Sequence, residues 1–379
     1  MSKTYEKRMI SVPVEAILDQ ARLAPSGDNI QPWLVKIISD REWWVFKNQP
    51  DSLSLSNYFR GGLYCGVGAF IEAIVIAASQ HGFRVSVTYT EDIRPETGHL
   101  ASLMFEAQSD SGQREALQPL YTVFSERRTD SRRYARTAIE RDSIEKIQKS
   151  ASHLGGRVIC IENPSLLRRL SKAFSKHDDF FWTNDEKPRE DLVKLVHRFK
   201  SPSVSNVGMP TNTLGLGWKG RFLPSIFRTA YYIPWLWKLI GWQSKYISED
   251  LIRHSGAIVL ITLPKQREKK IFEPGYQVKD DLDGGRILLR SWLLATTMGL
   301  SVQPVYALVA QMQNEGSIEE GEYFLRLNQE VITELVSIAP NLKQETLVAA
   351  FRIGRPLSTA PVPSSPRKPL EEIIWDVKA

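Results

Sequence analysis

Two stretches of the chain repeat one apolar pattern at a distance of 217 residues. Residues 68–82 and residues 285–299 both begin and end with Gly, and they share an Ala at matching positions 78 and 295. Each reads as a helix that is apolar on most sides and ends at a C-terminal Gly. A β-like run follows each of them. The pattern predicts two buried core helices that each lead into a strand.

A shorter match lies upstream of each predicted core helix. Residues 14–21 and residues 144–151 share the spacing of an amphipathic helix, and predicted strands follow at 34–38 and 157–161. The chain therefore has the pattern of an α+β fold that is duplicated within one chain as an intramolecular pseudo-dimer. The halves are predicted at 1–123 and 124–379.

The two predicted halves differ in a complementary way. The first half has a loop, Pro25–Trp33, that the second half lacks, and the second half begins with a basic segment, Glu126–Arg133, that the first half lacks. This complementarity predicts one composite site between the halves. The alternative is accidental divergence around a structural pseudo-dimer.

The distance along the chain between matching residues grows from 130 at the first match to 217 at the core helices. This increase predicts an insertion in the second half, at about 162–250. Its aromatic-rich part, residues 222–242, is interrupted by Pro224, Pro234, Arg228 and Lys238, which argues against a membrane-spanning helix. Aromatic residues suit a lid over a flat ring or a subunit interface. They also suit a membrane surface, which is the less favoured interpretation.

Composition excludes several classes of protein. The chain has 379 residues, of which 42% are hydrophobic and 24% charged, so it is neither disordered nor fibrous. Its net charge of +6 is modest for the length and its basic runs are scattered, which does not indicate nucleic-acid binding. The two cysteines and the lack of a signal-peptide pattern predict a cytoplasmic protein. No metal-ligand spacing is present, so no metal is expected.

The loop and the basic segment contain the candidate chemistry. Pro25 is expected to end a helix, and Gly27 to take a left-handed turn. Ser26 and Asn29 offer short hydrogen-bonding groups, whereas Gln31 and Trp33 have at least as good a structural interpretation. Arginines that can donate paired charged hydrogen bonds suit a phosphomonoester. The basic segment contains three such arginines, Arg127, Arg128 and Arg132, and Thr129 adds a hydroxyl group.

Three segments resemble the nitroreductase-like FMN-binding family. They are Ala24–Trp33, Arg127–Arg132 and Ser365–Ile374, and the duplicated form is similar to the dormancy-associated Acg-like proteins. Ordinary members are homodimers with two FMN sites built by both subunits. The resemblance therefore implies FMN between the halves.

The resemblance also implies a role for each matching residue. The first half would contribute Pro25, Ser26, Gly27 and Asn29. The phosphate and the ribityl chain would meet Arg127, Arg128, Thr129, Arg132 and Arg367, although the extra Ser131 leaves Arg133 as an alternative to Arg132. The backbone of Pro304, Tyr306 and Ala307 would lie beside the reactive flavin nitrogen.

The implied function is an FMN-dependent oxidoreductase that uses NAD(P)H to reduce a small nitroaromatic-like or quinone-like acceptor. This chemistry requires no catalytic acid–base pair from the protein, and none is predicted. The alternatives are a flavin-storing or flavin-sensing protein, and a specialised flavin-dependent dehydrogenase or oxidase of biosynthesis. The chain would act as a monomer or associate further.

Overall fold

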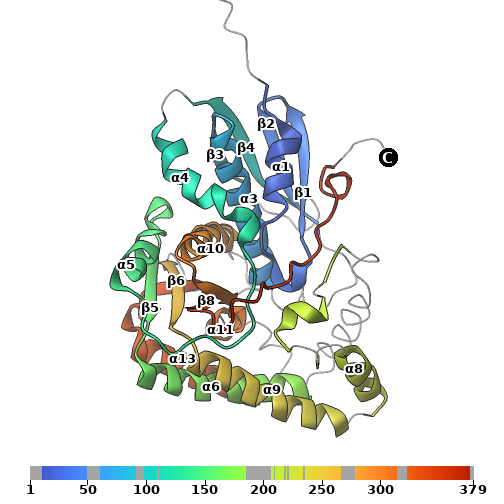
Figure 1. Ribbon diagram of the computed structural model, residues 1–379, viewed down its shortest axis with the longest axis vertical. Helices are drawn as coiled ribbons and strands as arrows, with labels where there is room; N and C mark the ends of the chain where they lie inside the picture. Colours follow the sequence, from blue (N-terminus) through green and yellow to red (C-terminus); the bar gives the residue numbers. More distant parts are fainter. Residues whose placement is uncertain are drawn as a thin grey trace, which may run out of the picture.

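A computed structural model shows a mixed helix and sheet architecture, as the sequence predicts (Figure 1). The structure describes residues 11–48, 60–90, 98–108, 111–184, 206–208, 210–216, 219, 222–233, 235–265, 278–313 and 322–375. The strands of these residues form two four-stranded antiparallel sheets. One sheet belongs to each predicted half.

The described helices of the first unit share one hydrophobic core with its sheet. Its elements are α1 (Val14–Ala21), β1 (Trp33–Ser39), β2 (Glu42–Lys47), α3 (Arg60–Gln80), β3 (Phe83–Tyr89), β4 (His99–Ala107) and α4 (Gly112–Thr122). The strand order is β1-β2-β4-β3. Helix α3 is long and apolar enough to cross a membrane, but 89% of its apolar window is buried inside the protein. It is therefore the core helix that the repeat predicts.

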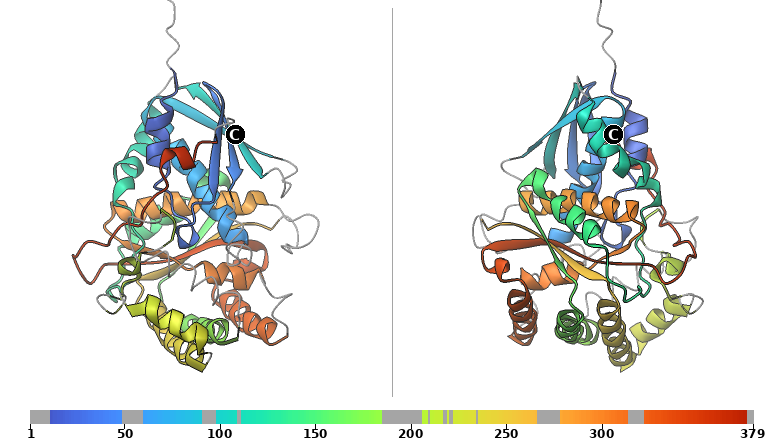
Figure 2. Two further views of the ribbon diagram at one scale, coloured as in Figure 1. Left: turned by 90° about the vertical axis from the view of Figure 1, so that its right-hand side faces the viewer. Right: turned by 60° about the vertical axis from the view of Figure 1, so that its left-hand side comes forward.

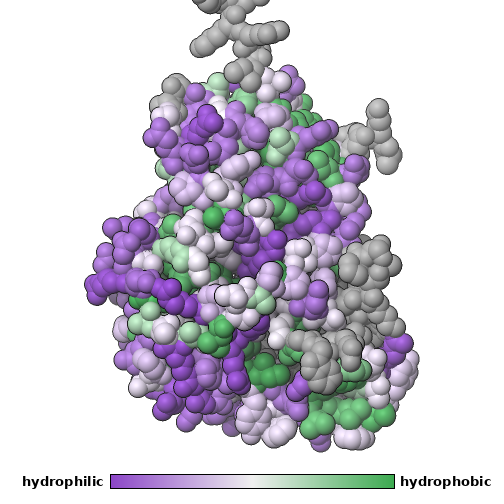
Figure 3. All heavy atoms as spheres, in the orientation of Figure 1, coloured by the Kyte–Doolittle hydropathy of each residue, from purple (hydrophilic) through white to green (hydrophobic). Residues whose placement is uncertain are grey.

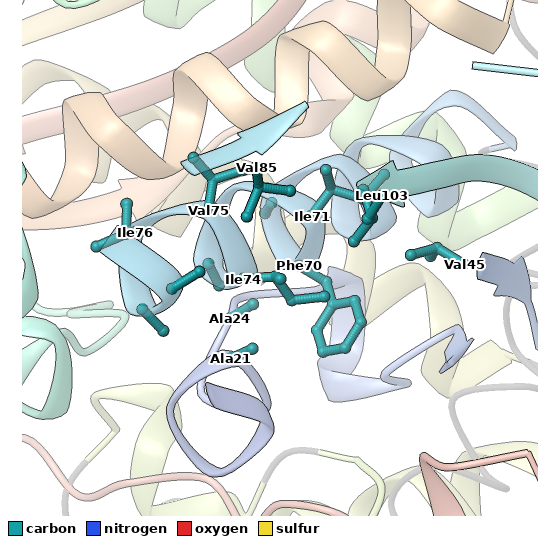
Figure 4. Packing of buried hydrophobic residues seen from close by; sticks show 14 of the residues in the cluster. Ala21, Ala24, Val45, Phe70, Ile71, Ile74, Val75, Ile76, Val85 and Leu103 are labelled. Atoms are coloured by element: carbon teal, nitrogen blue, oxygen red, sulfur yellow. The ribbon is translucent and has the colours of Figure 1, made fainter. Parts of the chain in front are cut away.

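The core of the first unit forms around α3. Phe70 stacks on Trp33 of β1, with ring centroids 4.7 Å apart and an interplanar angle of 5°. Figure 4 shows Phe70 and Ile74 directed towards Ala21 and Ala24, which come from α1 and the loop after it. All of these side chains are buried. The loop 24–33 is thus fixed at both ends by the hydrophobic core.

The second unit has more helices than the first. Its elements are α5 (Arg141–Lys149), β5 (Arg157–Ile161), α6 (Pro164–Asn184), α8 (Leu223–Tyr232), α9 (Trp235–Arg253), β6 (Ala257–Pro264), α10 (Val278–Thr297), β7 (Ser301–Pro304), α11 (Tyr306–Met312), α13 (Glu322–Ile338) and β8 (Glu345–Gly354). The strand order is β5-β6-β8-β7. Helix α10 lies on one face of this sheet, and α6, α9, α11 and α13 lie on the other (Figure 2).

The insertion lies between β5 and β6. The first unit joins the corresponding strands β1 and β2 by a tight turn at residues 40–41, whereas the second unit inserts α6, α8 and α9 there. The insertion therefore ends before Ala257, a few residues later than the predicted boundary at about 250. Its central part, residues 185–205, lies outside the described residues.

The two units share their order of elements. Each sheet pairs its strands in the order first, second, fourth, third, and each unit has its long core helix between the second and third strands. Both core helices end at a left-handed glycine, Gly82 with φ 80° and Gly299 with φ 68°, which confirms the predicted ends. The shared order agrees with the duplication hypothesis. Duplication and the boundary at 123/124 remain predictions.

The core helices α3 and α10 touch through their backbones. A Cβ atom on Gly68 would lie 1.9 Å from the carbonyl oxygen of Leu282, and one on Gly285 would lie 1.8 Å from the carbonyl oxygen of Cys65. Leu282 precedes Gly285 by three residues, as Cys65 precedes Gly68. The contact is thus reciprocal, as it is across a two-fold axis between identical subunits.

We predict that Gly285→Ala destabilises the protein strongly. The added methyl group would clash with backbone atoms of Cys65 and Ala69. Backbone atoms inside a helix cannot move aside as a flexible side chain can. The expected loss in free energy of unfolding is about 3 kcal/mol, the upper end for over-packing, measured by chemical denaturation. Gly27→Ala is the matched control, because a Cβ there meets nothing within 4 Å. Equal stability of the two variants would contradict the tight crossing.

Candidate functional site

The loop 24–33 has a strained backbone. Asp28, Asn29 and Gln31 have positive φ angles of 48°, 56° and 52°. The prediction that Gly27 takes the left-handed turn is wrong, because its φ is not positive. Helix α1 also ends at Ala21, well before Pro25, the residue expected to end it. Positive φ on non-glycine residues costs energy and persists only where surrounding contacts fix it.

Gln31 supplies many of those contacts. Its side chain is fully buried, and its Nε2 donates to the carbonyl oxygens of Asn29 (3.2 Å) and Asn206 (2.6 Å). Its Oε1 accepts from the backbone N–H of Lys368 (2.8 Å), and the Lys368 Nζ donates to the Gln31 carbonyl oxygen (3.0 Å). The Ser26 hydroxyl oxygen accepts from the Gln31 N–H (3.0 Å). Gln31 thus holds the loop, as its structural interpretation predicts.

Asn29 joins three distant segments. Its Nδ2 donates to the carbonyl oxygens of Gly208 (3.0 Å) and Pro366 (2.9 Å), and its Oδ1 accepts from Nη1 of Arg367 (2.8 Å). Both ends of the amide are therefore used within the protein. In the structure Asn29 positions Arg367, and its contribution to flavin binding stays a prediction.

Two arginines from different segments converge on one carbonyl group. Arg127 is buried and lies over the ring of Trp292, 4.5 Å from its centroid. Its Nη2 donates to the Leu23 carbonyl oxygen (3.0 Å), and Nη2 of Arg367 reaches the same oxygen (3.4 Å). The Nε atoms of both arginines are buried and have no hydrogen-bond partner among the described residues. Arg22 and Arg128 lie close by, and we call these four residues the arginine cluster.

The positive charges at the centre of the arginine cluster are not balanced within the described residues. Neither Arg127 nor Arg367 pairs with a carboxylate there. Burial lowers the pKa of Arg127, and Arg367 and Arg128 lower it further. Burial is the main cause that lowers the pKa of Arg367 to about 10, and the positive charges of Arg128 and Arg22 add to it. Buried charges without a counter-ion are costly, so this arrangement fits a bound anion that accepts paired hydrogen bonds, such as a phosphate group.

The rest of the basic segment is held by the protein. Arg132 forms a two-point ion pair with Asp130, with distances of 2.8 and 2.9 Å, so it does not supply a third unpaired guanidinium group. Arg133, the alternative to Arg132, pairs with Asp250. Arg128 donates to the carbonyl oxygens of Ser125 (2.6 Å) and Arg127 (2.8 Å).

The basic segment also runs alongside β7. Thr129 forms a parallel bridge with Val302, and the Asp130 N–H donates to the Val302 carbonyl oxygen (2.9 Å). Strand β7 ends at Pro304, just before Tyr306 and Ala307. The structure therefore brings together the two parts of the second half that the resemblance implies.

Residues from both halves lie against one end of α3. A Cβ atom on Gly62 would lie 3.1 Å from the Tyr306 ring, and one on Gly66 would lie 3.2 Å from the Ser26 Cβ. Gly62 and Gly66 are one helical turn apart and leave room there. Neither glycine is predicted from the sequence as part of the site, although glycine inside a long helix is a signal for close approach. Arg22, Trp292 and Lys368 are likewise not predicted from the sequence.

The matching positions on α10 carry charged side chains. At the offset of 217, Gly62 and Gly66 correspond to Lys279 and Asp283, and Tyr306 corresponds to Tyr89. The Tyr89 hydroxyl donates to Asp283, and the Lys279 Nζ lies 5.8 Å from the centroid of the Tyr89 ring. One end of the helix pair is therefore lined by glycines, and the other is filled by charged groups.

An ion network extends from the charged end. Glu72 of α3 is fully buried and accepts from the Nε atoms of Arg286 (2.8 Å) and Arg290 of α10. Burial alone raises the pKa of Glu72, but Arg290 and Arg286 lower it to about 2. His153 lies 4.0 Å from Glu72, and burial lowers its pKa to about 4. This network joins the two units through paired charges.

No family model matches the chain. It is 22% identical over 298 residues to the uncharacterised protein MT1398 of Mycobacterium tuberculosis, which covers 77% of this chain; the chain spans about 39% of that relative. Solved structures similar to the chain include a nitroreductase with bound FMN from Bacteroides fragilis (13% identity, 66% of this chain, 95% of that one, TM-score 0.36). Another is a mutant of the FMN- and NADPH-dependent nitroreductase NfnB from Sphingopyxis sp. strain HMH. It is 13% identical, the match covers 69% of this chain and 99% of that one, and the TM-score is 0.38. Identities below 25% with TM-scores below 0.5 do not establish a family, so the functional conclusion depends on the chain's own residues.

We predict that inorganic phosphate stabilises the protein through Arg127. The melting temperature in phosphate should exceed that in chloride at equal ionic strength by several degrees, because an anion that binds only the folded state stabilises it. In Arg127→Gln this rise should be absent, while the melting temperature in chloride stays equal or increases. A surface arginine paired with Glu334, in Arg169→Gln, is the control that keeps the rise. A large loss of stability in Arg127→Gln would instead indicate a structural role.

We also predict a contribution of His153 to acid sensitivity. Its folded pKa of about 4 lies below its ordinary value of 6.5, so the unfolded state binds a proton first as the pH falls. This contribution is fully present above pH 6.5 and decreases down to pH 4. About 2 kcal/mol of this contribution is lost by pH 5. The free energy of unfolding of His153→Gln, measured from pH 7 to pH 5, should fall less than that of the parent chain. Parallel curves would contradict the assignment.

Proposed function

We propose that the chain is an FMN-dependent oxidoreductase with one composite flavin site. The observation that supports this best is the convergence of Arg127 and Arg367 on Leu23, with no carboxylate to balance them among the described residues. Their donors suit the phosphate of FMN. FMN is preferred over other phosphates because the three segments that meet here are those that resemble the FMN-binding family.

The chain's own residues would bind and orient the cofactor. Arg127 and Arg367 would hold its phosphate, and Arg128 would add charge at the edge. Pro25, Ser26 and Gly27 would come from the first half, and the backbone of residues 304–307 from the second. When bound, FMN accepts and donates a hydride. NAD(P)H is the proposed donor, and a small nitroaromatic-like or quinone-like molecule is the proposed acceptor.

One site per chain follows from the difference between the two helix ends. Gly62 and Gly66 leave room at one end, whereas Lys279, Asp283 and Tyr89 fill the corresponding positions at the other. A flavin at the second position would displace a buried and paired ion network, which is costly. We therefore expect one FMN per chain.

A flavin-storing or flavin-sensing role is the second candidate. Residues 206–208 of the insertion hydrogen-bond to Asn29 and Gln31, so the insertion is anchored directly at the proposed site. An anchored insertion suits a cover that excludes substrate. The two functions differ in whether bound flavin is reduced by NAD(P)H and turns over with a quinone.

We predict that the purified chain binds FMN at one per chain and at least tenfold more tightly than riboflavin, which lacks the phosphate. A charge-assisted contact contributes about 1.5–3 kcal/mol, so Arg367→Gln should lose about 10- to 100-fold in FMN affinity and little in riboflavin affinity. Quenching of flavin fluorescence measures both. Equal affinity for FMN and riboflavin would contradict the phosphate assignment. Tight FMN binding without NAD(P)H oxidation would favour storage.

A further inference from the structure

The α8–α9 hairpin carries a large exposed apolar surface at one end of the molecule. In Figure 3 hydrophobic residues gather over α8 and α9, at the end opposite the first sheet (Figures 1 and 2). Tyr232, Trp235 and Trp242 are 77%, 65% and 52% exposed. The other exposed large apolar residues of the two helices are Ile226, Tyr231, Ile233, Leu239, Tyr246 and Ile247. Monomeric proteins seldom leave such a contiguous patch without a partner.

The exposed residues of α9 form a stripe along one side of the helix. Trp235, Leu239, Trp242 and Tyr246 follow each other at intervals of four, three and four residues, the spacing of a single helix face. Trp242 and Tyr246 pack edge to face, with centroids 4.9 Å apart. We call these four residues the outer stripe. Trp242 and Tyr246 therefore form a contiguous part of this surface.

The hairpin has a separate small core, so the outer stripe is not left exposed by loose folding. Phe227 of α8 stacks on Trp237 of α9, with centroids 5.8 Å apart, and both side chains are buried together with Ala230. Trp237 is thus directed inward while Trp235 and Trp242 are directed outward. The exposed aromatics belong to a defined face.

The surrounding sequence is strongly basic. Between residues 192 and 248 the chain has no Asp or Glu and eight Lys or Arg: Lys194, Arg198, Lys200, Lys219, Arg221, Arg228, Lys238 and Lys245. Because the whole chain has a net charge of +6, the remainder of the chain has a net charge of −2. The net positive charge of the protein is therefore concentrated in the insertion. Lys219, Arg228 and Lys238 are exposed there.

We propose that the α8–α9 hairpin docks the protein on an anionic membrane surface. Trp and Tyr prefer the boundary between lipid headgroups and acyl chains, and Lys and Arg beside them bind anionic headgroups. A second copy of the chain is the less suitable occupant. A two-fold interface would place the same exposed cations against each other, and the two acidic residues of α9, Glu249 and Asp250, already pair with Arg253 and Arg133.

Binding to vesicles tests this proposal with the full chain and needs no flavin, so its outcome is independent of the proposed function. The chain should co-sediment with vesicles of phosphatidylcholine and phosphatidylglycerol (3:1), and at least tenfold more weakly with phosphatidylcholine alone. Brominated lipids should quench its tryptophan fluorescence. Binding to the anionic vesicles should weaken at least tenfold between 0.1 and 0.5 M NaCl, since salt screens surface charge.

Variants assign the binding to the hairpin. Trp235→Ser/Trp242→Ser should lower the anionic-vesicle partition coefficient at least tenfold, and Lys238→Gln/Lys245→Gln should lower it about 10- to 30-fold. Trp375→Ser is the matched control, because Trp375 is 42% exposed and packs against Phe46 of the first unit, away from the hairpin. It should bind as the parent does. Circular dichroism checks that each variant is folded.

Three outcomes would contradict the proposal. One is the absence of binding to anionic vesicles together with absence of quenching by brominated lipids in the unmodified chain, a result that needs no variant. Another is a concentration-dependent dimer that Trp235→Ser/Trp242→Ser abolishes, which would identify a second copy as the occupant. The third is equal loss of binding in Trp375→Ser, which would contradict the assignment to the hairpin.

Discussion

The backbone contact between α3 and α10 is the constraint on which the rest of the structure depends. At Gly68 and Gly285 each helix lies against a carbonyl oxygen of the other, so close that only glycine fits. Other faces of each helix pack on the sheet of its own unit and on neighbouring helices. The repeated stretches of such helices are apolar on most sides, which is the pattern that makes them visible in the sequence. Both sheets, and the loops that leave them, are therefore positioned by this crossing.

A reciprocal crossing has two related ends, and the chain gives them opposite electrostatics. At one end Glu72 is balanced by Arg286 and Arg290, so its buried charges are paired. At the other end Arg127 and Arg367 share a single carbonyl group and find no carboxylate among the described residues. A paired network stabilises the folded state without a ligand, whereas an excess of buried cations is relieved by an anion. The asymmetry of charge thus distinguishes a structural end from a ligand-binding end.

The sequence predicted those features that local pattern determines. The core helices, their terminal glycines, the strands at 157–161 and after Gly82, and the place of the insertion all follow from apolar period and turn residues. Partners that are distant in sequence could not be predicted. Positive φ falls on Asp28 and Asn29 because residues 206–208 and 366–368 hold the loop, and local propensity alone assigned it to Gly27. Arg132 was indistinguishable from Arg127 in the sequence, since only the fold shows that Asp130 pairs with one of them.

The insertion converts this related pair of units into an asymmetric protein. In the first unit a turn of two residues connects β1 to β2, while in the second unit the same connection holds α6, α8 and α9. One part of the insertion, residues 206–208, is bonded to Asn29 and Gln31. Another part, the α8–α9 hairpin, carries the exposed aromatic face. Gly208 and Phe222 are 14 positions apart, so the site loop and the outer surface are connected by a short stretch of chain. A partner that binds the hairpin can change the loop 24–33 only if the stretch 208–222 has two arrangements. The partner must then bind these two arrangements with different affinities.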